Sequence, residues 1–415
     1  MIQIRDLINQ ALDEEMDLNS NIYILGEEVG KSGGPHGISK NLIKKYGRKR
    51  VLDTPISEMG FTGLAVGSGY LGLRPVVDFM TWNFALQSID HIINSCAKTL
   101  YMSGGQVRCP IVFRGPNGFN SGYSAQHTQD FSAYYGSIPG LKVVCPYTGK
   151  DHKGLLKSAI RDNNPVVYLE NEMLYSDMYH EVDSEYTQPL DKCVVEKGGR
   201  DVTVLGISLS LREIFSADKI LEDLNISCEI INLVSVRPVD YDTIVQSVCK
   251  TKKIVIVDFS FPQYGVASEL SACLYDKCYE VLDKPILRLM GKDVPTPYAS
   301  NLEKKAFPSS EDVVEAVRKI LYGMVRSPLG QGQFVVDCSD SITRIGKVRG
   351  KNYKRVWIQP NDIVLLSIRE GNNNRADIEI KYMQKEIKIL KDNGYIEDTF
   401  TSSNNENVKV DFDRI

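Results

Sequence analysis

Short apolar runs alternate with helical patterns through the first half of the chain. The runs NIYILGEE, RPVVDFM, PIVFRG, LKVVCPY and PVVYLEN are short, apolar and rich in β-branched residues, which predicts buried strands. Between them, ALQSIDHIINSCAKT and KDHKGLLKSAI have helical spacing. This alternation, from about residue 20 to 185, predicts an α/β fold in which helices cover both faces of a parallel sheet.

The pattern changes twice further along the chain. After the polar stretch YHEVDSEYTQPLDKC, a second α/β run has DVTVLGIS, SCEIINLV, KKIVIVDFS and PILRLMG as strands and ends in the capped helix SSEDVVEAVRKIL. After Leu321 the sequence is β-rich, with frequent turns and a basic middle. We therefore predict domains at 1–185, 186–321 and 322–400, followed by a disordered tail at 401–415.

Composition agrees with a globular protein of several domains. The chain has 415 residues, of which 42% are hydrophobic and 25% charged, with a net charge of -4. That charge gives no global attraction to nucleic acid, so a polyanion site would have to be a local patch. The odd number of cysteines, 9 without a CxxC pair, indicates reduced thiols.

Sequence features also bear on location. No apolar run reaches the roughly 18 to 20 residues that span a bilayer, so we expect no contact with a membrane. The first residues, MIQIRDLINQALDEEMD, are acidic and periodic, unlike a secretory signal or an Arg-rich presequence. The sequence therefore predicts a cytoplasmic protein.

Glu58 lies in DTPISEMGFTG, just before a Gly-rich segment. One interpretation is a carboxylate that caps a helix, and these few residues alone favour it. The other is a buried carboxylate placed for proton transfer, since a poorly hydrated site raises the proton affinity of a carboxylate.

His127 lies in SGYSAQHTQDFSAYYG, a loop after the strand PIVFRG. A single histidine is most often structural. A loop at a strand end, with Ser, Gln and Thr neighbours, also suits an acid or a group that orients a ligand. The histidines of the chain, His36, His91, His127, His152 and His180, show no metal-ligand spacing.

From about residue 2 to Leu321 the chain resembles the beta subunit of the first component of pyruvate dehydrogenase. The resemblance is carried by DTPISEMGFTG, PVVDFMTWNFALQSIDHIINSCAKTLYMSGG, PIVFRGPNG, AQHTQDFSAYYGSIPGLKVV and SAIRDNNPVVYLENE. Branched-chain 2-oxo acid dehydrogenase beta subunits share the layout but differ in the FRGPNG and AQHTQDF stretches, so the resemblance favours pyruvate. It implies a thiamine-diphosphate-binding, transketolase-like pyrimidine domain followed by a transketolase C-terminal-type α/β domain.

The resemblance also implies roles for individual residues. Glu58 matches the glutamate that activates thiamine diphosphate through a hydrogen bond to the aminopyrimidine ring. Met80 and Phe84 match apolar residues around that ring, although their i, i+4 spacing would suit core packing equally well. His127 matches an active-site histidine near the acyl-transfer step.

Ions and partners follow from the same resemblance. A structural potassium ion would be held by backbone oxygens of Ile111, Ala159, Ile160, Asp162 and Asn164. The sequence has no GDG followed by a downstream Asn, the element that holds magnesium and diphosphate in thiamine enzymes. The implied assembly has two alpha and two beta chains, with the diphosphate and Mg²⁺ on alpha, and passes the acetyl group to a lipoyl-bearing acyltransferase. Eukaryotic relatives are usually mitochondrial, which is the alternative location.

Residues from about Tyr322 to Phe400 resemble the OB-fold of the factor one-A family of eukaryotic translation initiation factors. The strings LGQGQF, KVRGKNYKRVWI, NDIVLLSIRE and ADIEIKY carry this resemblance, which implies binding to ribosomal RNA. The candidate RNA-binding residues are Arg344, Lys347, Arg349, Lys351, Lys354, Arg355 and Trp357. A solvated charged face remains the plainer interpretation of the basic run. Two alternatives to an enzyme subunit stay open: an RNA-binding initiation factor with an enzyme-like domain, and a gene model that fuses two neighbours.

Overall fold

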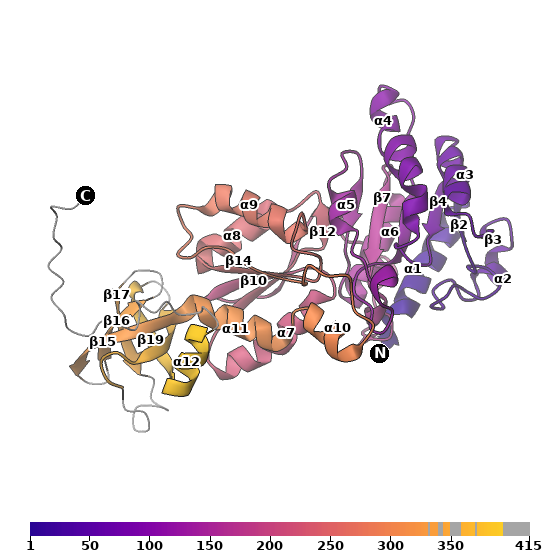
Figure 1. Cartoon of the computed structure of the whole chain (residues 1–415). Coiled ribbons are helices and arrows are strands. Elements are labelled where there is room, and N and C mark those ends of the chain that lie inside the picture. The colour runs from indigo at the N-terminus through magenta and orange to yellow at the C-terminus, as the bar shows by residue number, and fades with distance from the viewer. Residues whose placement is uncertain (331–332, 339–342, 349–357, 370–371, 393–415) are drawn as a thin grey trace, which may run out of the picture. The chain divides into compact units, whose positions relative to one another are not determined.

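The computed structural model describes residues 1–330, 333–338, 343–348, 358–369 and 372–392 (Figure 1). It divides into two compact units, which are described separately. The larger unit comprises Met1–Ala217 and Cys228–Val313, and the smaller comprises Asp218–Ser227 and Val314–Ile415.

A seven-stranded sheet forms the first half of the larger unit. Its strands, in spatial order, are β12 (Ser235–Arg237), β6 (Lys142–Val144), β7 (Val166–Glu170), β5 (Val112–Pro116), β4 (Arg74–Asp78), β2 (Ile22–Gly26) and β3 (Val51–Asp53). All neighbouring strands are parallel except β12, which is antiparallel to β6. Every residue of β2, β5 and β7 is buried, as in a parallel sheet with both faces covered. The strands expected from the apolar runs are confirmed.

Helices precede or lie between these strands in the sequence, and some are short. They are α1 (Ile4–Leu18), α2 (Leu42–Tyr46), α3 (Glu58–Tyr70), η1 (Ala85–Ser88), η2 (His91–Ala97), α4 (Thr99–Met102), η3 (Ala125–His127), α5 (Ser132–Gly136), α6 (Gly149–Arg161) and η4 (Glu172–Leu174). The expected helix over ALQSIDHIINSCAKT is irregular, because η1 is a 3₁₀-helix and η2 a π-helix. A short sheet joins β1 (Ile2–Gln3) to β8 (Met178–Tyr179).

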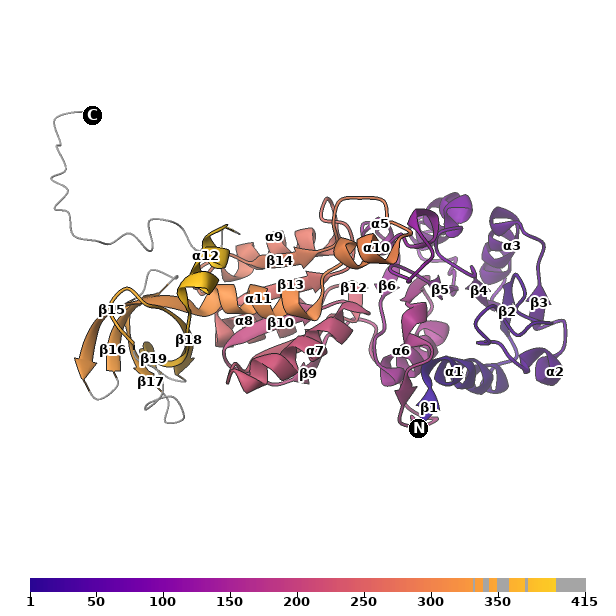
Figure 2. The same ribbon diagram turned by 60° about the horizontal axis from the view of Figure 1, so that its bottom comes forward.

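Helices α1 and α6 lie side by side, as Figure 2 shows. A capping box at Thr148 and Asp151 starts α6. The buried Lys153 and Lys157 side chains of α6 donate to Glu14 of α1 at 2.7 and 2.8 Å. These ion pairs satisfy cations that would otherwise be costly to bury.

A second sheet has five strands, in the order β14 (Leu287–Met290), β13 (Ile254–Asp258), β10 (Val202–Gly206), β11 (Cys228–Asn232) and β9 (Val194–Lys197). It is parallel except for the edge strand β9. The helices of this part of the sequence are α7 (Ser210–Asp223), α8 (Tyr241–Thr251), α9 (Val266–Cys278), α10 (Ser300–Ala306) and α11 (Ser310–Leu321), and the boundary between the two units falls within α7 and within α11. The expected cap of α11 is present, since Ser309 and Asp312 exchange hydrogen bonds through their side chains and backbone amides.

The smaller unit contains a closed barrel. Its strands, in spatial order, are β15 (Tyr322–Gly330), β16 (Gln333–Cys338), β17 (Thr343–Val348), β19 (Asn372–Lys381) and β18 (Ile363–Arg369), and β18 pairs back to β15. Val336, Val364 and Ile378 are among its buried residues. Helix α12 (Gln384–Asp392) follows the last strand. Strand β15 begins at the residue after α11 ends, so no linker separates them.

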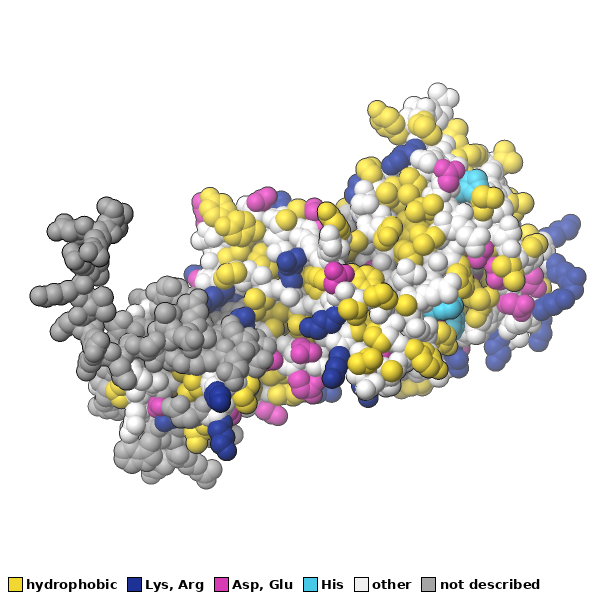
Figure 3. Space-filling view, in the orientation of Figure 1, with side chains coloured by type: hydrophobic (Ala, Val, Ile, Leu, Met, Phe, Trp, Pro, Cys, Tyr) yellow, Lys and Arg dark blue, Asp and Glu magenta, His cyan; other side chains and the backbone are white. Residues whose placement is uncertain are grey.

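Basic side chains form a cluster on one part of the larger unit. In Figure 3, basic side chains gather over α2 in the larger unit, where the sequence reads KKYGRKR from residue 44 to 50. Within the part of the chain that the structure describes, no helix combines the length and apolar character needed to cross a bilayer.

Candidate active site

The predicted catalytic and cofactor-binding residues follow the carboxyl ends of strands β3, β4 and β5. These strands lie together in the order β5, β4, β2, β3 and run in the same direction. Glu58 follows β3, Met80 and Phe84 follow β4, and His127 follows β5. In open α/β sheets this edge is where ligands bind.

Glu58 is the first residue of α3, and its side chain is buried at 4% exposure. Its Oε2 atom is fully buried and has no hydrogen-bond partner among the described residues. The helix-capping interpretation does not account for this oxygen. Leaving a buried polar atom unpaired costs about 1–3 kcal/mol. A ligand that donates a hydrogen bond to Glu58 Oε2 would remove this cost.

Glu27 adds a second carboxylate to this edge, directly after β2. Burial raises its pKa, and the carboxylates of Glu58 and Glu28 raise it further. Glu27 was not among the predicted site residues, although its position directly after the apolar run NIYILG marks it as a residue at the end of a strand. A carboxyl group beside Glu58 with a raised pKa strengthens the case for proton transfer at this edge.

Met80 sits in a tight turn at the end of β4. Its backbone has φ of 58°, a left-handed conformation that is uncommon for residues other than glycine. The Met80 amide donates to Asp78 Oδ1 at 3.0 Å. Strained backbone of this kind is concentrated at ligand-binding sites.

Phe84 and His127 come from different loops and meet at this edge. Their rings are 5.4 Å apart between centroids and nearly perpendicular at 87°. The backbone amide of Gln129, two residues after His127, donates to Asn83 Oδ1 at 3.2 Å. The His127 loop is also held by Glu303, whose carboxylate accepts from the Gly122 amide at 2.7 Å.

Helix α3 is tied to the loop that carries Met80 and Phe84. Thr62 Oγ1 lies 2.9 Å from Ser88 Oγ in η1, and the Phe61 and Phe79 rings are 6.0 Å apart. Glu58, Met80, Phe84 and His127 are therefore carried by elements that pack on one another at one end of the sheet.

Family comparisons match the chain in three consecutive stretches. Residues 1–178 match the transketolase pyrimidine binding domain, and residues 191–313 the transketolase C-terminal domain. Residues 311–405 match translation initiation factor 1A / IF-1.

Individual relatives decide the family. The mitochondrial pyruvate dehydrogenase E1 component subunit beta-2 of Oryza sativa subsp. japonica is 50% identical, covering 78% of this chain and 87% of that protein. The Rickettsia bellii subunit beta is 48% identical over 77% of this chain and 99% of that protein. The chain belongs to the family of pyruvate dehydrogenase E1 beta subunits.

The fold of this E1 beta chain is similar to that of a solved transketolase structure. A solved structure described as a split gene transketolase, inactive beta4 tetramer, has a TM-score of 0.62 at 21% identity and covers 77% of this chain and 97% of that chain. The predicted transketolase-like α/β fold with an added OB barrel is confirmed. The relatives are named mitochondrial or come from bacteria, and the cytoplasmic location stays a prediction.

The predicted potassium ligands of this E1 beta chain lie away from the active-site edge. Ile111 precedes β5, Ala159 and Ile160 end α6, and Asp162 and Asn164 precede β7, so the group gathers at the amino-terminal edge of the sheet. Arg74 Nη1 donates to the carbonyl oxygens of Ile160 and Asp162 at 2.9 and 2.8 Å. Among the residues described, no cluster of three or more His, Cys, Asp or Glu side chains could hold a metal ion.

The candidate RNA-binding residues are only partly described. Lys347 is exposed on β17. Arg344 on the same strand is buried at 1% exposure, which corrects the expectation that it faces solvent as part of a basic patch. The remaining candidates, Arg349, Lys351, Lys354, Arg355 and Trp357, lie outside the described residues.

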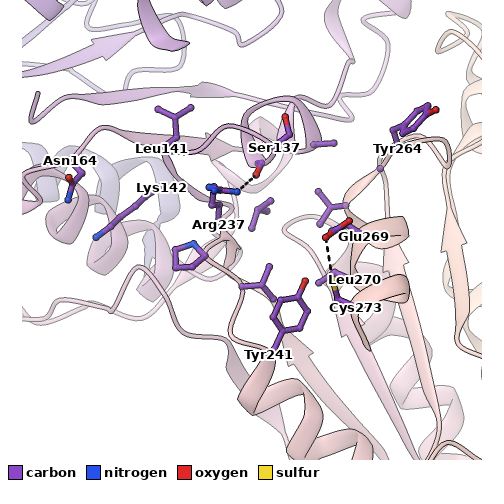
Figure 4. A pocket seen from close by; sticks show the side chains of 18 residues that line it. Ser137, Leu141, Lys142, Asn164, Arg237, Tyr241, Tyr264, Glu269, Leu270 and Cys273 are labelled. Atoms are coloured by element: carbon purple, nitrogen blue, oxygen red, sulfur yellow. Dashed lines mark hydrogen bonds between the residues drawn. The ribbon is translucent and has the colours of Figure 1, made fainter. Parts of the chain in front are cut away.

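A separate cavity of about 890 Å³ lies between α5 and β12 on one side and α8 and α9 on the other (Figure 4). Arg237, Tyr241, Glu269 and Cys273 line it, and Glu269 accepts from Cys273 Sγ at 3.2 Å. Asn164 is the one predicted site residue in this lining. The cavity is thus distinct from the edge that carries Glu58.

Proposed function

We propose that this chain is the beta subunit of an acetyl-transferring pyruvate dehydrogenase. It takes part in thiamine-dependent oxidative decarboxylation of pyruvate and reductive acetyl transfer to a lipoyl group. The observation that carries the proposal is the buried, unpartnered Glu58 Oε2 at the carboxyl edge of the sheet. Its setting is a chain half identical to E1 beta subunits over most of their length.

The residues at this edge fit thiamine diphosphate. Glu58 would hydrogen-bond to a ring nitrogen of the aminopyrimidine, which satisfies its unpaired oxygen. Met80 and Phe84 would supply apolar contacts to the same ring. When bound, the cofactor would supply a nucleophilic ring carbon for the keto group and an electron-poor ring to take up the electron pair left when carbon dioxide departs.

The protein's own side chains would set the protonation state of the cofactor ring and orient the reacting groups. Glu58, in a poorly hydrated site, favours the ring protonation state in which the cofactor is reactive. His127, whose ring contacts Phe84, would donate a hydrogen bond during acyl transfer to the lipoyl group. These roles of Met80, Phe84 and His127 rest on their family positions and on the loop packing described above.

We propose that an alpha chain completes the site. It would hold the diphosphate and Mg²⁺, in an assembly of two alpha and two beta chains that delivers acetyl groups to a lipoyl-bearing acyltransferase. Thiamine diphosphate with Mg²⁺, at a hundredfold excess over Kd, is expected to raise the melting temperature of the mixed chains by roughly 5 to 10 °C. The beta chain alone should shift by less than about 1 °C. An equal shift without alpha would contradict a shared site.

The potassium site is proposed on the same family grounds. The oxygens of Ile160 and Asp162 already accept from Arg74, and a carbonyl oxygen has a second lone pair with which to bind a cation. In the melting experiment, replacing potassium by sodium should lower the melting temperature with or without cofactor. An unchanged melting temperature would contradict the proposed potassium site.

RNA binding by the barrel is a second candidate function. It is supported by the match of residues 311–405 to translation initiation factor 1A / IF-1 and by the closed barrel. The full chain should bind a ribosomal RNA fragment in a salt-dependent manner, and Lys347→Glu should weaken binding several-fold because it reverses a phosphate contact. A chain ending at Leu321 should lose RNA binding while keeping the cofactor-induced melting shift that it shows when mixed with alpha. Equal RNA affinity in the shortened chain would contradict the proposal.

A further inference from the structure

A buried ion cluster lies directly beneath the active-site loops. Arg114 of β5 is 1% exposed, and its Nε and Nη2 atoms donate to the two oxygens of Glu170 at 2.7 and 2.6 Å. Its Nη1 atom donates to Asp78 Oδ2. The Tyr175 hydroxyl also donates to Glu170. The cluster joins the carboxyl ends of three neighbouring strands, β4, β5 and β7.

On one side the cluster fixes the turn at Met80. Asp78 uses its second oxygen, Oδ1, to accept from the Met80 amide at 3.0 Å. The carbonyl oxygen of Arg114 accepts from the Phe79 amide at 3.0 Å. Arg114 therefore holds Phe79 through its backbone carbonyl and Asp78 through its side chain, and Asp78 in turn holds Met80. This explains how Met80 is kept in a left-handed conformation that costs an isolated residue on the order of 1–3 kcal/mol.

On the other side the cluster fixes the loop of His127. The carbonyl oxygen of Glu170 accepts from the Asn117 amide at 2.7 Å. Asn117 Oδ1 in turn accepts from the Phe131 amide at 2.8 Å, which closes the loop that contains His127. The Met80 loop and the His127 loop are therefore both attached to the ion cluster of Arg114. The contact between Phe84 and His127 depends on the geometry of that cluster.

We propose that Arg114 is a positioning residue that sets the spacing between the Met80 loop and the His127 loop through Asp78 and Glu170. It does not touch the reacting atoms. Its bidentate contact with Glu170 and its third contact with Asp78 need the planar fork of a guanidinium, which a lysine ammonium does not reproduce. The part concerning cofactor binding rests on the proposed function, whereas the loop geometry does not.

Arg114→Lys tests the proposal in the chain assembled with alpha. We expect the KM for thiamine diphosphate to rise about 10- to 100-fold, with a smaller fall in kcat at saturating cofactor, since a misplacement of about 1 Å can cost a factor of roughly 10². Asp78→Asn keeps an acceptor for the Met80 amide and replaces the carboxylate that meets Arg114. It should act in the same direction with a smaller effect, and it serves if Arg114→Lys fails to fold.

A matched control is Lys157→Met, which removes another cation of 1% exposure from its carboxylate partner, in the interface of α1 and α6. It should lower the melting temperature and leave the KM for the cofactor unchanged. An unchanged KM in both Arg114→Lys and Asp78→Asn would overturn the proposal, and so would an equal rise in Lys157→Met.

A cofactor-free readout separates this inference from the proposed function. The chain has 2 tryptophans, so in a Trp357→Phe background all tryptophan fluorescence comes from Trp82. Trp82 is fully buried, and the centroids of its ring and the Phe79 ring are 5.3 Å apart. Arg114→Lys should shift Trp82 emission to longer wavelength, and Lys157→Met should not. Unshifted emission in Arg114→Lys would overturn the positioning role. Shifted emission together with a wild-type assembly that does not decarboxylate pyruvate would leave the loop support standing and remove the proposed function.

Discussion

Replacing Glu58 with glutamine is expected to slow pyruvate decarboxylation by the assembled alpha and beta chains by about 10²- to 10⁴-fold. Glutamine has nearly the same shape but cannot exchange a proton with a ring nitrogen. Because the loss concerns proton transfer rather than binding, kcat should fall far more than the KM for thiamine diphosphate rises.

The stability of the same variant gives an independent readout. Glu58 Oε2 is buried without a partner among the described residues, so removing its charge should leave the melting temperature unchanged or raise it slightly. A carboxylate that served the fold by capping α3 would show the opposite result.

Glu311→Gln is the matched control for Glu58→Gln. Glu311 is also an acid in the first turn of a helix, but it is exposed. Its replacement should keep normal turnover. Normal turnover in Glu58→Gln would remove this residue from the mechanism.

Replacing Trp82 with alanine is expected to lower the free energy of unfolding by about 3–5 kcal/mol. Trp82 is fully buried, its ring lies 4.9 Å from that of Tyr135, and its Nε1 donates to the carbonyl oxygen of Tyr168 at 3.3 Å. Its amide donates to the Pro116 oxygen at 2.9 Å, so it also anchors the loop between Met80 and Phe84. Urea unfolding followed by circular dichroism measures the change.

Two variants calibrate that measurement. Trp82→Phe keeps an aromatic ring and should lose clearly less stability than Trp82→Ala. Tyr101→Ala removes an aromatic side chain that is 91% exposed and should change the free energy by less than about 0.5 kcal/mol. A loss below about 1 kcal/mol in Trp82→Ala would contradict the packing described for this loop.

Much of the α/β fold is predictable from the sequence, because buried parallel strands leave continuous apolar runs such as those of β2 and β7. Strand β12 was missed, since Ser235–Arg237 is too short to give a pattern and pairs with a sheet formed by the preceding half of the chain. A helix was predicted over ALQSIDHIINSCAKT, but the 3₁₀ form of η1 and the π form of η2 were not, because apolar spacing does not distinguish these forms from an α-helix.

The site shows a similar division. The positions of Glu58, Met80, Phe84 and His127 came from family resemblance, and the strand order then brings their loops together. The left-handed turn at Met80 depends on contacts with Asp78 that no local pattern reveals. Arg114 did leave a signal, as a charged residue inside the apolar run PIVFRG.

Arg344 illustrates a signal that was available but unused. Strand β17 alternates in burial, and Arg344 shares its inward face with Val348. Period-two alternation, applied to TRIGKV, would have placed Arg344 inside the barrel and Lys347 outside. Charge alone therefore placed one residue too many, Arg344, on the exposed basic surface of the barrel.

The most direct test of the central claim is the release of carbon dioxide from carboxyl-labelled pyruvate, measured with thiamine diphosphate and Mg²⁺ for the full-length chain, an alpha chain, and both together. Release is expected only from the mixture, and Glu58→Gln in this chain should slow it by about 10²- to 10⁴-fold. Release by either chain alone, or none from a correctly assembled mixture, would contradict the assignment of this chain as the beta subunit of a pyruvate dehydrogenase.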